Sequence, residues 1–479
     1  MNRLTLVLAL AGCNVPLAHF TGGGDGGSGD LQADAEHLPP GDFVWIRSLS
    51  QIQTQTIASG ASGIVTPAYL YTTANINGTL LTSAGNADLV IAEFTEADGT
   101  NLYAVDHGNV GSEFGLLATV ASNGNPMVSG VTEGDKTIDL GLGPLSGGGT
   151  PVEDGYIGAY SNGVADWDAR LVGPGSDKFL ASARGPGSTI WGAGWFEPSC
   201  MFIGPSTNLA LTSAGGRDAF LVNFNIFTGA VNVMKQYGGA GRDEVSSGGV
   251  ATLDTDLTTL VLSGFYDNAE TINFGGTAAA VTSVGGGLDM WIAKLDSTGT
   301  GIWAVTYGGP GDDRDVSVVL DAKGDVYLTG TFTTSISFGT IALTSVGGVD
   351  HFIAKLDGTN GSPIWAISFG SVNNENAGRI AVDNNGHVAW TGNVAGALNG
   401  MATDGGLDAY LAEFSSADGS KIWDHLITTG ADDSGAGVAY GKVTGDLFVS
   451  ISTGAPYSYG MPIIGPDQAP LDVLIRVAP

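Results

Sequence analysis

The sequence predicts an all-β fold, a seven-bladed β-propeller whose four-stranded blades repeat about every 63 residues. Three observations predict it. Glycine contributes 77 of the 479 residues and charged residues only 14%, a composition poor in helix formers and rich in turns. Two kinds of strand alternate along the chain. The ends of the folded region carry complementary halves of that repeat, which predicts a closed ring without exposed sheet edges.

The repeated unit is clearest at 286–309, 347–370 and 405–430. Each copy holds a Gly-rich turn, an aspartate, an alternating strand, a polar loop and a second strand that carries Ile-Trp. The aspartate recurs at Asp88, Asp154, Asp218, Asp289, Asp350, Asp408 and Asp472. The anchor of the second strand recurs at Trp45, Tyr103, Trp167, Val233, Trp303, Trp365 and Trp423. A unit of this length suits one propeller blade with long loops.

The two ends of the folded region predict how the ring closes. The first segment, "DFVWIRSL" around Trp45, is a Trp-type strand without a preceding Asp-type partner. The last segment, "DVLIRVAP" around Asp472, is an Asp-type strand without a Trp-type follower. Pairing of these two strands would complete the seventh blade, whereas an open array would need capping repeats instead.

The N-terminal region divides the chain into three parts. Residues 1–12 have a basic start and a short apolar run, which is typical of a signal peptide. The motif Leu10-Ala11-Gly12-Cys13 resembles the bacterial lipobox, which implies cleavage before Cys13 and lipidation of that residue. Residues 13–40 are rich in Gly and Asp and predict a flexible tether, and residues 41–479 form the propeller domain. Because Asn14 follows the cysteine, we expect an outer-membrane lipoprotein, periplasmic or surface-exposed, in a bacterial cell envelope.

A family resemblance rests on "YGGPGDDRDVSVVLDAKGDVYLTGTF", which follows Val305 and Thr306. The stretch resembles the bacterial seven-bladed β-propeller repeat, with its Gly-Gly, Asp-Asp and Val-Tyr-x-Thr-Gly elements. The resemblance covers about residues 41–479 and weakens toward the N-terminus. It implies a secreted or surface-exposed propeller, and the family as a class has no established chemistry. Locally, "LDGTNGSPIW" also resembles the tryptophan-docking motif of quinoprotein propellers, a device that packs blades.

Two sets of acidic residues are candidate site residues. The repeated aspartates, Asp350 among them, are expected to be structural and to accept hydrogen bonds from backbone N–H groups in the Gly turn. Position 351 varies between repeats, so Asp350 and His351 are not predicted to be a catalytic pair. A second set lies ten residues after each anchor, at Gln55, Glu113, Asp177, Asp243, Asp313, Glu375 and Asp433. These residues either bond their own turns or form a ring that binds cations such as Ca²⁺, and the sequence does not identify the metal.

Charge and the lack of catalytic motifs bound the function. The formal net charge of −31 disfavours nucleic acid as a partner. No metal-ligand His pair, nucleophile elbow or phosphate loop is present in the sequence, so no catalytic residue is predicted. The first hypothesis is a monomeric, lipid-anchored binding module for a protein or glycan, without a cofactor other than Ca²⁺. The alternatives are a secreted polysaccharide lyase or hydrolase with a site at the channel mouth, and a scaffold of an envelope assembly complex.

Overall fold

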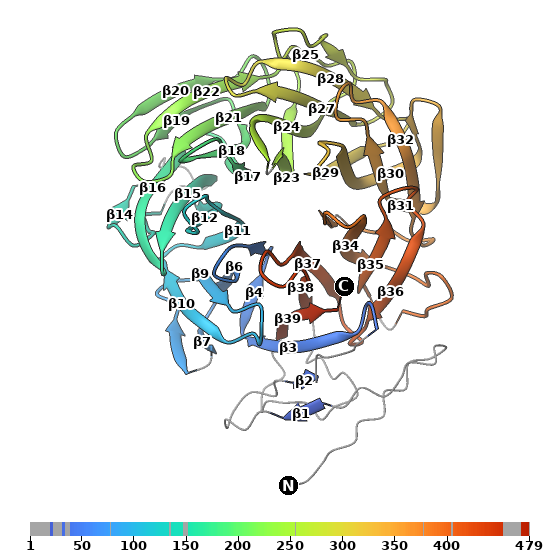
Figure 1. Ribbon diagram of the computed structural model, residues 1–479. Helices are drawn as coiled ribbons and strands as arrows, with labels where there is room; N and C mark the ends of the chain where they lie inside the picture. The colour runs from blue at the N-terminus through green and yellow to red at the C-terminus, as the bar shows by residue number, and fades with distance from the viewer. Residues whose placement is uncertain are drawn as a thin grey trace.

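A computed structural model describes residues 20–22, 31–33, 39–76, 78–133, 136–146, 152–253, 255–376, 378–403, 406–453 and 471–478. Its strands form antiparallel sheets arranged as seven blades around a central channel (Figure 1). This arrangement confirms the predicted all-β, seven-bladed propeller. In each blade the strands lie side by side in chain order from the channel outward, except where the ring closes.

Four blades are plain four-stranded sheets, described here from the channel outward. Blade 3 contains β17 (Asp177–Arg184), β18 (Thr189–Phe196), β21 (Asp218–Asn225) and β22 (Val231–Tyr237). Blade 4 contains β23 (Asp243–Leu253), β24 (Asp256–Tyr266), β27 (Asp289–Asp296) and β28 (Gly301–Tyr307). Blade 5 contains β29 (Asp313–Leu320), β30 (Val326–Phe338), β31 (Ile341–Leu356) and β32 (Pro363–Phe369). Blade 6 contains β33 (Arg379–Val382), β34 (His387–Val394), β35 (Asp408–Ser415) and β36 (Lys421–Ile427).

The first two blades carry additions to this plan. Blade 1 contains β4 (Ile52–Thr54) with the short β5 (Ala58–Ser59), then β6 (Ile64–Leu70), β9 (Asp88–Phe94) and β10 (Asn101–His107). Blade 2 contains β11 (Glu113–Val120), β12 (Pro126–Glu133), β15 (Glu153–Ser161) and β16 (Val164–Val172). Outside β16 lie β19 (Ser199–Ile203) and β20 (Asn208–Thr212), which come from the loop between β18 and β21 and so tie blade 3 to blade 2.

Short hairpins project from three of the blade loops. They pair β7 (Thr73–Ile76) with β8 (Thr79–Thr82), β13 (Ile138–Asp139) with β14 (Pro144–Leu145), and β25 (Thr271–Ile272) with β26 (Val281–Thr282). In blade 5 the corresponding hairpin is continuous with β30 and β31, which explains the length of those two strands.

The ring closes as predicted. Blade 7 combines β37 (Asp433–Tyr440), β38 (Leu447–Thr453) and β39 (Leu471–Val477) with β3 (Phe43–Ser50) from the other end of the chain (Figure 1). The antiparallel register between β3 and β39 sets Leu49 opposite Asp472 and Arg47 opposite Leu474. The closing sheet therefore joins residues separated by more than 400 positions without a covalent link.

The edge of β3 is extended by two short strands that the sequence did not predict. β2 (Leu31–Ala33) pairs with β3, and β1 (Phe20–Gly22) pairs with β2. Both lie in the segment expected to be a flexible tether. A sheet edge offers unpaired N–H and C=O groups, and extended chain close to it can pair without needing apolar side chains.

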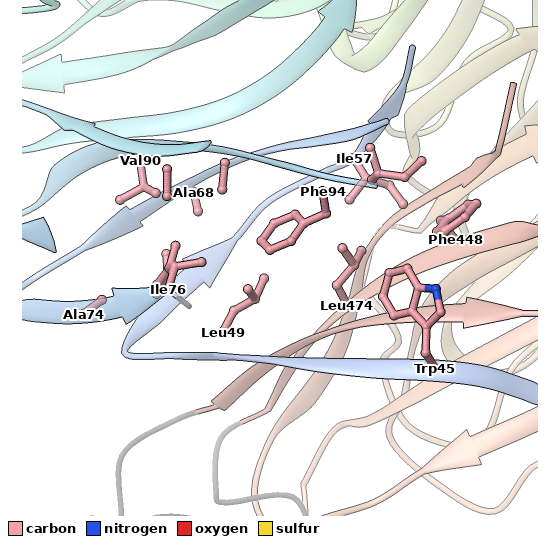
Figure 2. Close-up of a cluster of buried hydrophobic side chains, with 14 of the residues drawn as sticks. Trp45, Leu49, Ile57, Ala68, Ala74, Ile76, Val90, Phe94, Phe448 and Leu474 are labelled. Atoms are coloured by element: carbon pink, nitrogen blue, oxygen red, sulfur yellow. The ribbon is translucent and has the colours of Figure 1, made fainter. Parts of the chain in front are cut away.

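The hydrophobic core lies between neighbouring blades. Figure 2 shows the cluster at the closing junction, where Trp45 of β3, Leu474 of β39 and Phe448 of β38 pack near Phe94 and Ile57 of blade 1. The Trp45 and Phe448 ring centroids are 5.8 Å apart. Similar clusters fill the other junctions, so each blade buries its apolar faces against two neighbours.

A tryptophan anchor on the fourth strand of the repeat holds four of the junctions at their periphery. The indole N–H groups of Trp45, Trp167, Trp303 and Trp365 donate to backbone carbonyls in the outer turn of the next blade, at 2.9–3.2 Å. The turn glycine under the anchor adopts a left-handed φ, 68° at Gly99 and 74° at Gly361. A side chain there would collide with the ring. The docking device is thus a property of the repeat.

Candidate functional site

The repeated aspartates begin or lie within the third strand of each blade, and all seven are buried. In four blades one carboxyl oxygen accepts a hydrogen bond from the backbone N–H four residues earlier, in the Gly turn. The distances to Asp88, Asp218, Asp289 and Asp350 are 2.7, 3.0, 3.1 and 2.6 Å. These acids fix the turn that enters the strand. Close approach of the carboxyl also requires a glycine after the fourth strand, such as Gly238 against Asp218.

The acids that follow each anchor by ten residues lie at or before the start of the innermost strand. Glu113, Asp177, Asp243, Asp313 and Asp433 are the first residues of β11, β17, β23, β29 and β37, while Glu375 precedes β33. All six are buried. Several bond their own loops: the Gly239 N–H donates to Asp243 at 2.6 Å and the Ser371 N–H to Glu375 at 2.9 Å.

The structure brings one acid of each set together across a blade junction. In each case the acid on the innermost strand donates its backbone N–H to a carbonyl of the preceding blade. That carbonyl belongs to the residue just before the repeated aspartate of that blade. The Asp313 N–H bonds Leu288 O, next to Asp289, at 2.7 Å, and the Asp243 N–H bonds Arg217 O, next to Asp218, at 2.7 Å. Glu113, Glu375 and Asp433 repeat this bond at 2.6, 3.0 and 2.6 Å. The result is a series of buried carboxyl pairs around the ring.

Burial and mutual repulsion shift the ionisation of these pairs. Desolvation, and then the charge of Asp289, raises the pKa of Asp313 to about 8. Desolvation and the acids Glu270 and Asp218 raise the pKa of Asp243 to about 7. The pKa of Asp177 is raised to about 8 by burial and that of Glu113 to about 7 for the same first reason. Burial also raises the pKa of Glu375.

Two junctions differ from this pattern. Between blades 2 and 3, Arg170 forms an ion pair with Asp154 at 3.3 Å, and both side chains are almost fully buried. Between blades 7 and 1, Asp472 accepts hydrogen bonds from the backbone N–H and, at 2.8 Å, the hydroxyl of Thr54. Gln55, which the spacing places with the acids, instead donates its backbone N–H to Pro67 O. The acidic series is therefore replaced at the closing junction by one acid and a threonine.

The acids pair between neighbours and do not gather at one point on the axis. Within the described ranges, no three His, Cys, Asp or Glu side chains lie together in a way that could hold one metal ion. A Ca²⁺ ion takes six to eight oxygen ligands, more than a carboxyl pair supplies unless carbonyls or waters complete the shell. What the pairs can do directly is share protons.

His351 packs away from Asp350. Its Nε2 lies 2.9 Å from the carbonyl oxygen of Asn393, and its ring contacts Trp390 with centroids 4.6 Å apart. Complete burial lowers the pKa of His351 to about 4. A neutral imidazole held in the junction between blades 5 and 6 is a packing element with one polar anchor.

A cavity of about 740 Å³ lies at the opposite end of the innermost strands from the acids. The final residues of five innermost strands line it: Arg184, Leu253, Leu320, Val382 and Tyr440. Aliphatic side chains repeat in its wall at Val250, Val318, Ile380 and Val438. The turns of these blades form the rim, where Asp321, Asp383, Asn384 and Lys442 supply polar groups. The surface is concave and combines aliphatic side chains with many polar ones, and a concave surface of this size is typical of a ligand site.

Two rim acids also hold the turns in place. Asp321 accepts hydrogen bonds from the N–H groups of Lys323 and Asp325 at 2.9 and 3.0 Å. Asp383 does the same for Asn385 and His387, and its second oxygen lies 2.9 Å from His387 Nδ1. The sequence analysis did not single out this cavity. In the sequence, only the similar turns "LDAKGD" and "VDNNGH" could have indicated its rim.

The remaining sequence predictions fall on other parts of the chain. Cys13, the predicted lipidation site, and the predicted signal peptide at residues 1–12 lie outside the described residues. Cys200 is buried in β19, and burial raises the pKa of its thiol above the ordinary range. Over the ranges that the structure covers, no helix is long and apolar enough to span a membrane.

Comparison with known proteins gives a sequence relative and several distant structural likenesses. No protein family model matches it. It is 25% identical over 373 residues to the regulatory protein FlaEY of Caulobacter vibrioides, a match that covers 72% of this chain and 36% of that protein. The chain thus spans about a third of the length of this relative.

Three solved structures similar to this chain have TM-scores between 0.36 and 0.40. Quinohemoprotein alcohol dehydrogenase from Comamonas testosteroni is 11% identical with a TM-score of 0.40. The match covers 91% of this chain and 76% of the dehydrogenase chain. BamB from Moraxella catarrhalis is 12% identical with a TM-score of 0.36, covering 91% and 99%. Sqt1 from Saccharomyces cerevisiae is 7% identical with a TM-score of 0.40, covering 92% and 100%. The fold defines the class, a seven-bladed β-propeller, and these distant likenesses carry no functional argument.

Proposed function

We propose that the protein is a binding module, monomeric and non-enzymatic, that takes a protein partner at the cavity end of its channel. The single observation that supports this proposal is the cavity of about 740 Å³ where the innermost strands end. Its aliphatic wall suits an apolar side chain or a short loop of a partner, and its polar rim suits hydrogen bonds around that anchor. A glycan partner is the alternative from the sequence, and it is included in the test below.

A binding role accounts for the polar groups near the cavity more simply than a hydrolase or lyase does. Asp383 and His387 could be taken for an acid–base pair, but Asp383 already accepts two backbone hydrogen bonds of the turn. Asp321 has the same position in blade 5, where Tyr327 and Lys355 take the place of the histidine. A position that recurs with different partners is explained by turn geometry.

The test of this function uses a displayed random-peptide library and a bacterial glycan array as probes against the full-length protein. We expect selected peptides to lose at least tenfold in affinity for Leu320→Arg, which puts a charge in the cavity. The matched control is Val372→Arg, because Val372 is exposed in the loop at the other end of the channel. Binding that both variants retain would place the site elsewhere. Glycan binding that Leu320→Arg abolishes would replace the protein partner with a glycan, and no binding to either probe would reject the function.

We also propose that Cys13 is lipidated and anchors the propeller at the outer membrane of a bacterial envelope, and that the repeat is of the bacterial seven-bladed type. The lipobox-like sequence before Cys13 and the Gly- and Asp-rich segment after it support this location. Labelling of producing cells with an alkyne fatty acid should tag the wild-type chain and not Cys13→Ser. Equal labelling of both chains, or of neither, would contradict lipidation at this residue.

A further inference from the structure

Three consecutive junctions hold acid pairs that the proposed binding function does not use. They join blades 3 and 4, 4 and 5, and 5 and 6 through the pairs Asp218–Asp243, Asp289–Asp313 and Asp350–Glu375. The exposed fraction of these six side chains is 2% or less. Two ionised carboxylates in one buried place would repel each other and lose their hydration, a cost that proteins avoid by protonation or by counter-ions.

Each pair also has unused hydrogen-bonding capacity. Asp289 Oδ1 and both carboxyl oxygens of Asp313 are buried and find no hydrogen-bond donor among the described residues. The same holds for Oδ1 of Asp218 and Asp243. In the third pair the unsatisfied atoms are Asp350 Oδ1 and Glu375 Oε2. Buried polar atoms normally have partners, so each junction lacks something that both acids can bind.

Among the described residues, the groups around these pairs do not supply a counter-ion. Asp312 and Tyr266 face the Asp289–Asp313 pair, and the Tyr266 hydroxyl lies 2.5 Å from Thr306 Oγ1. Glu270 and Asp267 face Asp243. The nearby Arg217 and Arg242 are directed to Glu197, Glu244 and Asp267. Next to the third pair in sequence, the buried His351 turns its ring away, and its Nε2 lies 2.9 Å from Asn393 O.

We propose that each of these three junctions is a proton-binding site in which one proton is shared between its two carboxyl groups. A shared proton needs only one unsatisfied oxygen from each acid, and each pair leaves at least that many. A divalent cation would need several more ligands, and no third acid is grouped with a pair in a metal-binding arrangement within the described chain. The raised pKa values of Asp243 and Asp313, about 7 and about 8, agree with this assignment.

The sign of the linkage follows from these pKa values. The folded chain keeps protons that the unfolded chain releases, because an aspartate in an unfolded chain has a pKa near 3.9. Stability is therefore greatest in mild acid and falls as the pH rises from about 4 toward 8. The blade junctions would loosen as their protons leave.

The experiment measures protons released on unfolding of the full-length protein at pH 7, by calorimetry in buffers of different ionisation enthalpy. We expect Asp313→Asn to release about one proton fewer than the wild type, because a group of pKa about 8 is mostly protonated at that pH. The asparagine amide can donate to Asp289 as the protonated acid does. The control is Asp418→Asn, at an exposed turn acid whose pKa is lowered by hydrogen bonds from Ser420, and it should leave the proton release unchanged.

Three results would overturn the proposal. The first is equal proton release by Asp313→Asn and the wild type. The second is a rise in the wild-type melting temperature with CaCl₂ over EDTA that Asp313→Asn abolishes, because this result assigns a cation to the junction. If Asp313→Asn does not fold, Asp243→Asn gives the same test, and we expect this variant to release about half a proton fewer than the wild type. The third overturning result is that Asp243→Asn releases as many protons as the wild type.

Discussion

The junction between blades 4 and 5 and the junction that closes the ring between blades 7 and 1 meet the same packing demand with different polar groups. The first buries two carboxyls, Asp289 and Asp313, within a continuous stretch of chain. The second buries a single acid, Asp472, which bonds the backbone and hydroxyl of Thr54. The closing junction depends on strand pairing between the chain ends. Its polar contact, Asp472 with Thr54, contains only one carboxyl and therefore needs no proton shared between two acids.

This difference shows how a repeat can vary where its role changes. An internal junction can loosen without separating its strands, because the loops that connect the blades keep them close. At the closing blade, β3 reaches β39 only through hydrogen bonds and packing. At this place one oxygen of Asp472 is bonded by Thr54 while the other, Oδ1, finds no donor among the described residues. Because burial raises the pKa of Asp472 to about 7, the closing junction also loses stability as the pH rises, but through one carboxyl and not two.

The largest expected effect comes from removing the anchor of the closing junction. Trp45 is fully buried and its indole donates to Glu96 O at 3.2 Å. Trp45→Ala should lower the free energy of unfolding by about 3–5 kcal/mol, measured by denaturant unfolding. Trp303→Ala removes the equivalent anchor between blades 4 and 5 and is the matched control. If Trp303→Ala costs clearly more than Trp45→Ala, the closing junction is not the more sensitive one.

A smaller effect is expected from the acid of the same junction. Asp472→Ala leaves the buried Thr54 N–H and hydroxyl without their acceptor, at a cost of about 1–3 kcal/mol. Asp472→Asn keeps an acceptor oxygen and should cost less at pH 5. Since burial raises the pKa of Asp472 to about 7, the penalty of the asparagine should shrink further as the pH rises to 8. Thermal unfolding at both pH values measures this, and a penalty that grows with pH would contradict it.

The smallest expected effect comes from adding a second carboxyl to the closing junction, which makes it resemble the internal junctions. Thr54→Asp would place a second carboxyl beside Asp472, as Asp313 lies beside Asp289. The melting temperature of this variant should fall between pH 5 and pH 8.5 by about 2 °C more than that of the wild type. Thr54→Asn, of the same size and without charge, is the control. A parallel pH dependence of the two variants would show that a carboxyl at position 54 does not face Asp472.

Parts of this site could be predicted and parts could not. The two acidic sets and the docking anchors follow from spacing, because every repeat places the same residue at the same point of the blade. The pairing of Asp289 with Asp313 does not, because it depends on how one blade is rotated against the next. Gln55 fits the spacing, yet Thr54 makes the contact with Asp472, while the Gln55 N–H bonds Pro67 O within its own blade.

The sequence by itself determined the number of blades, the class of fold and the closure of the ring through Trp45 and Asp472. These are properties of a periodic pattern, and each copy of the repeat reports them again. Only the tertiary structure decided which buried acids share a junction, and that the ends of the innermost strands enclose a cavity. Both depend on groups that come together from different blades, where small differences in loop length and register move a carboxyl or a wall residue by whole side-chain widths.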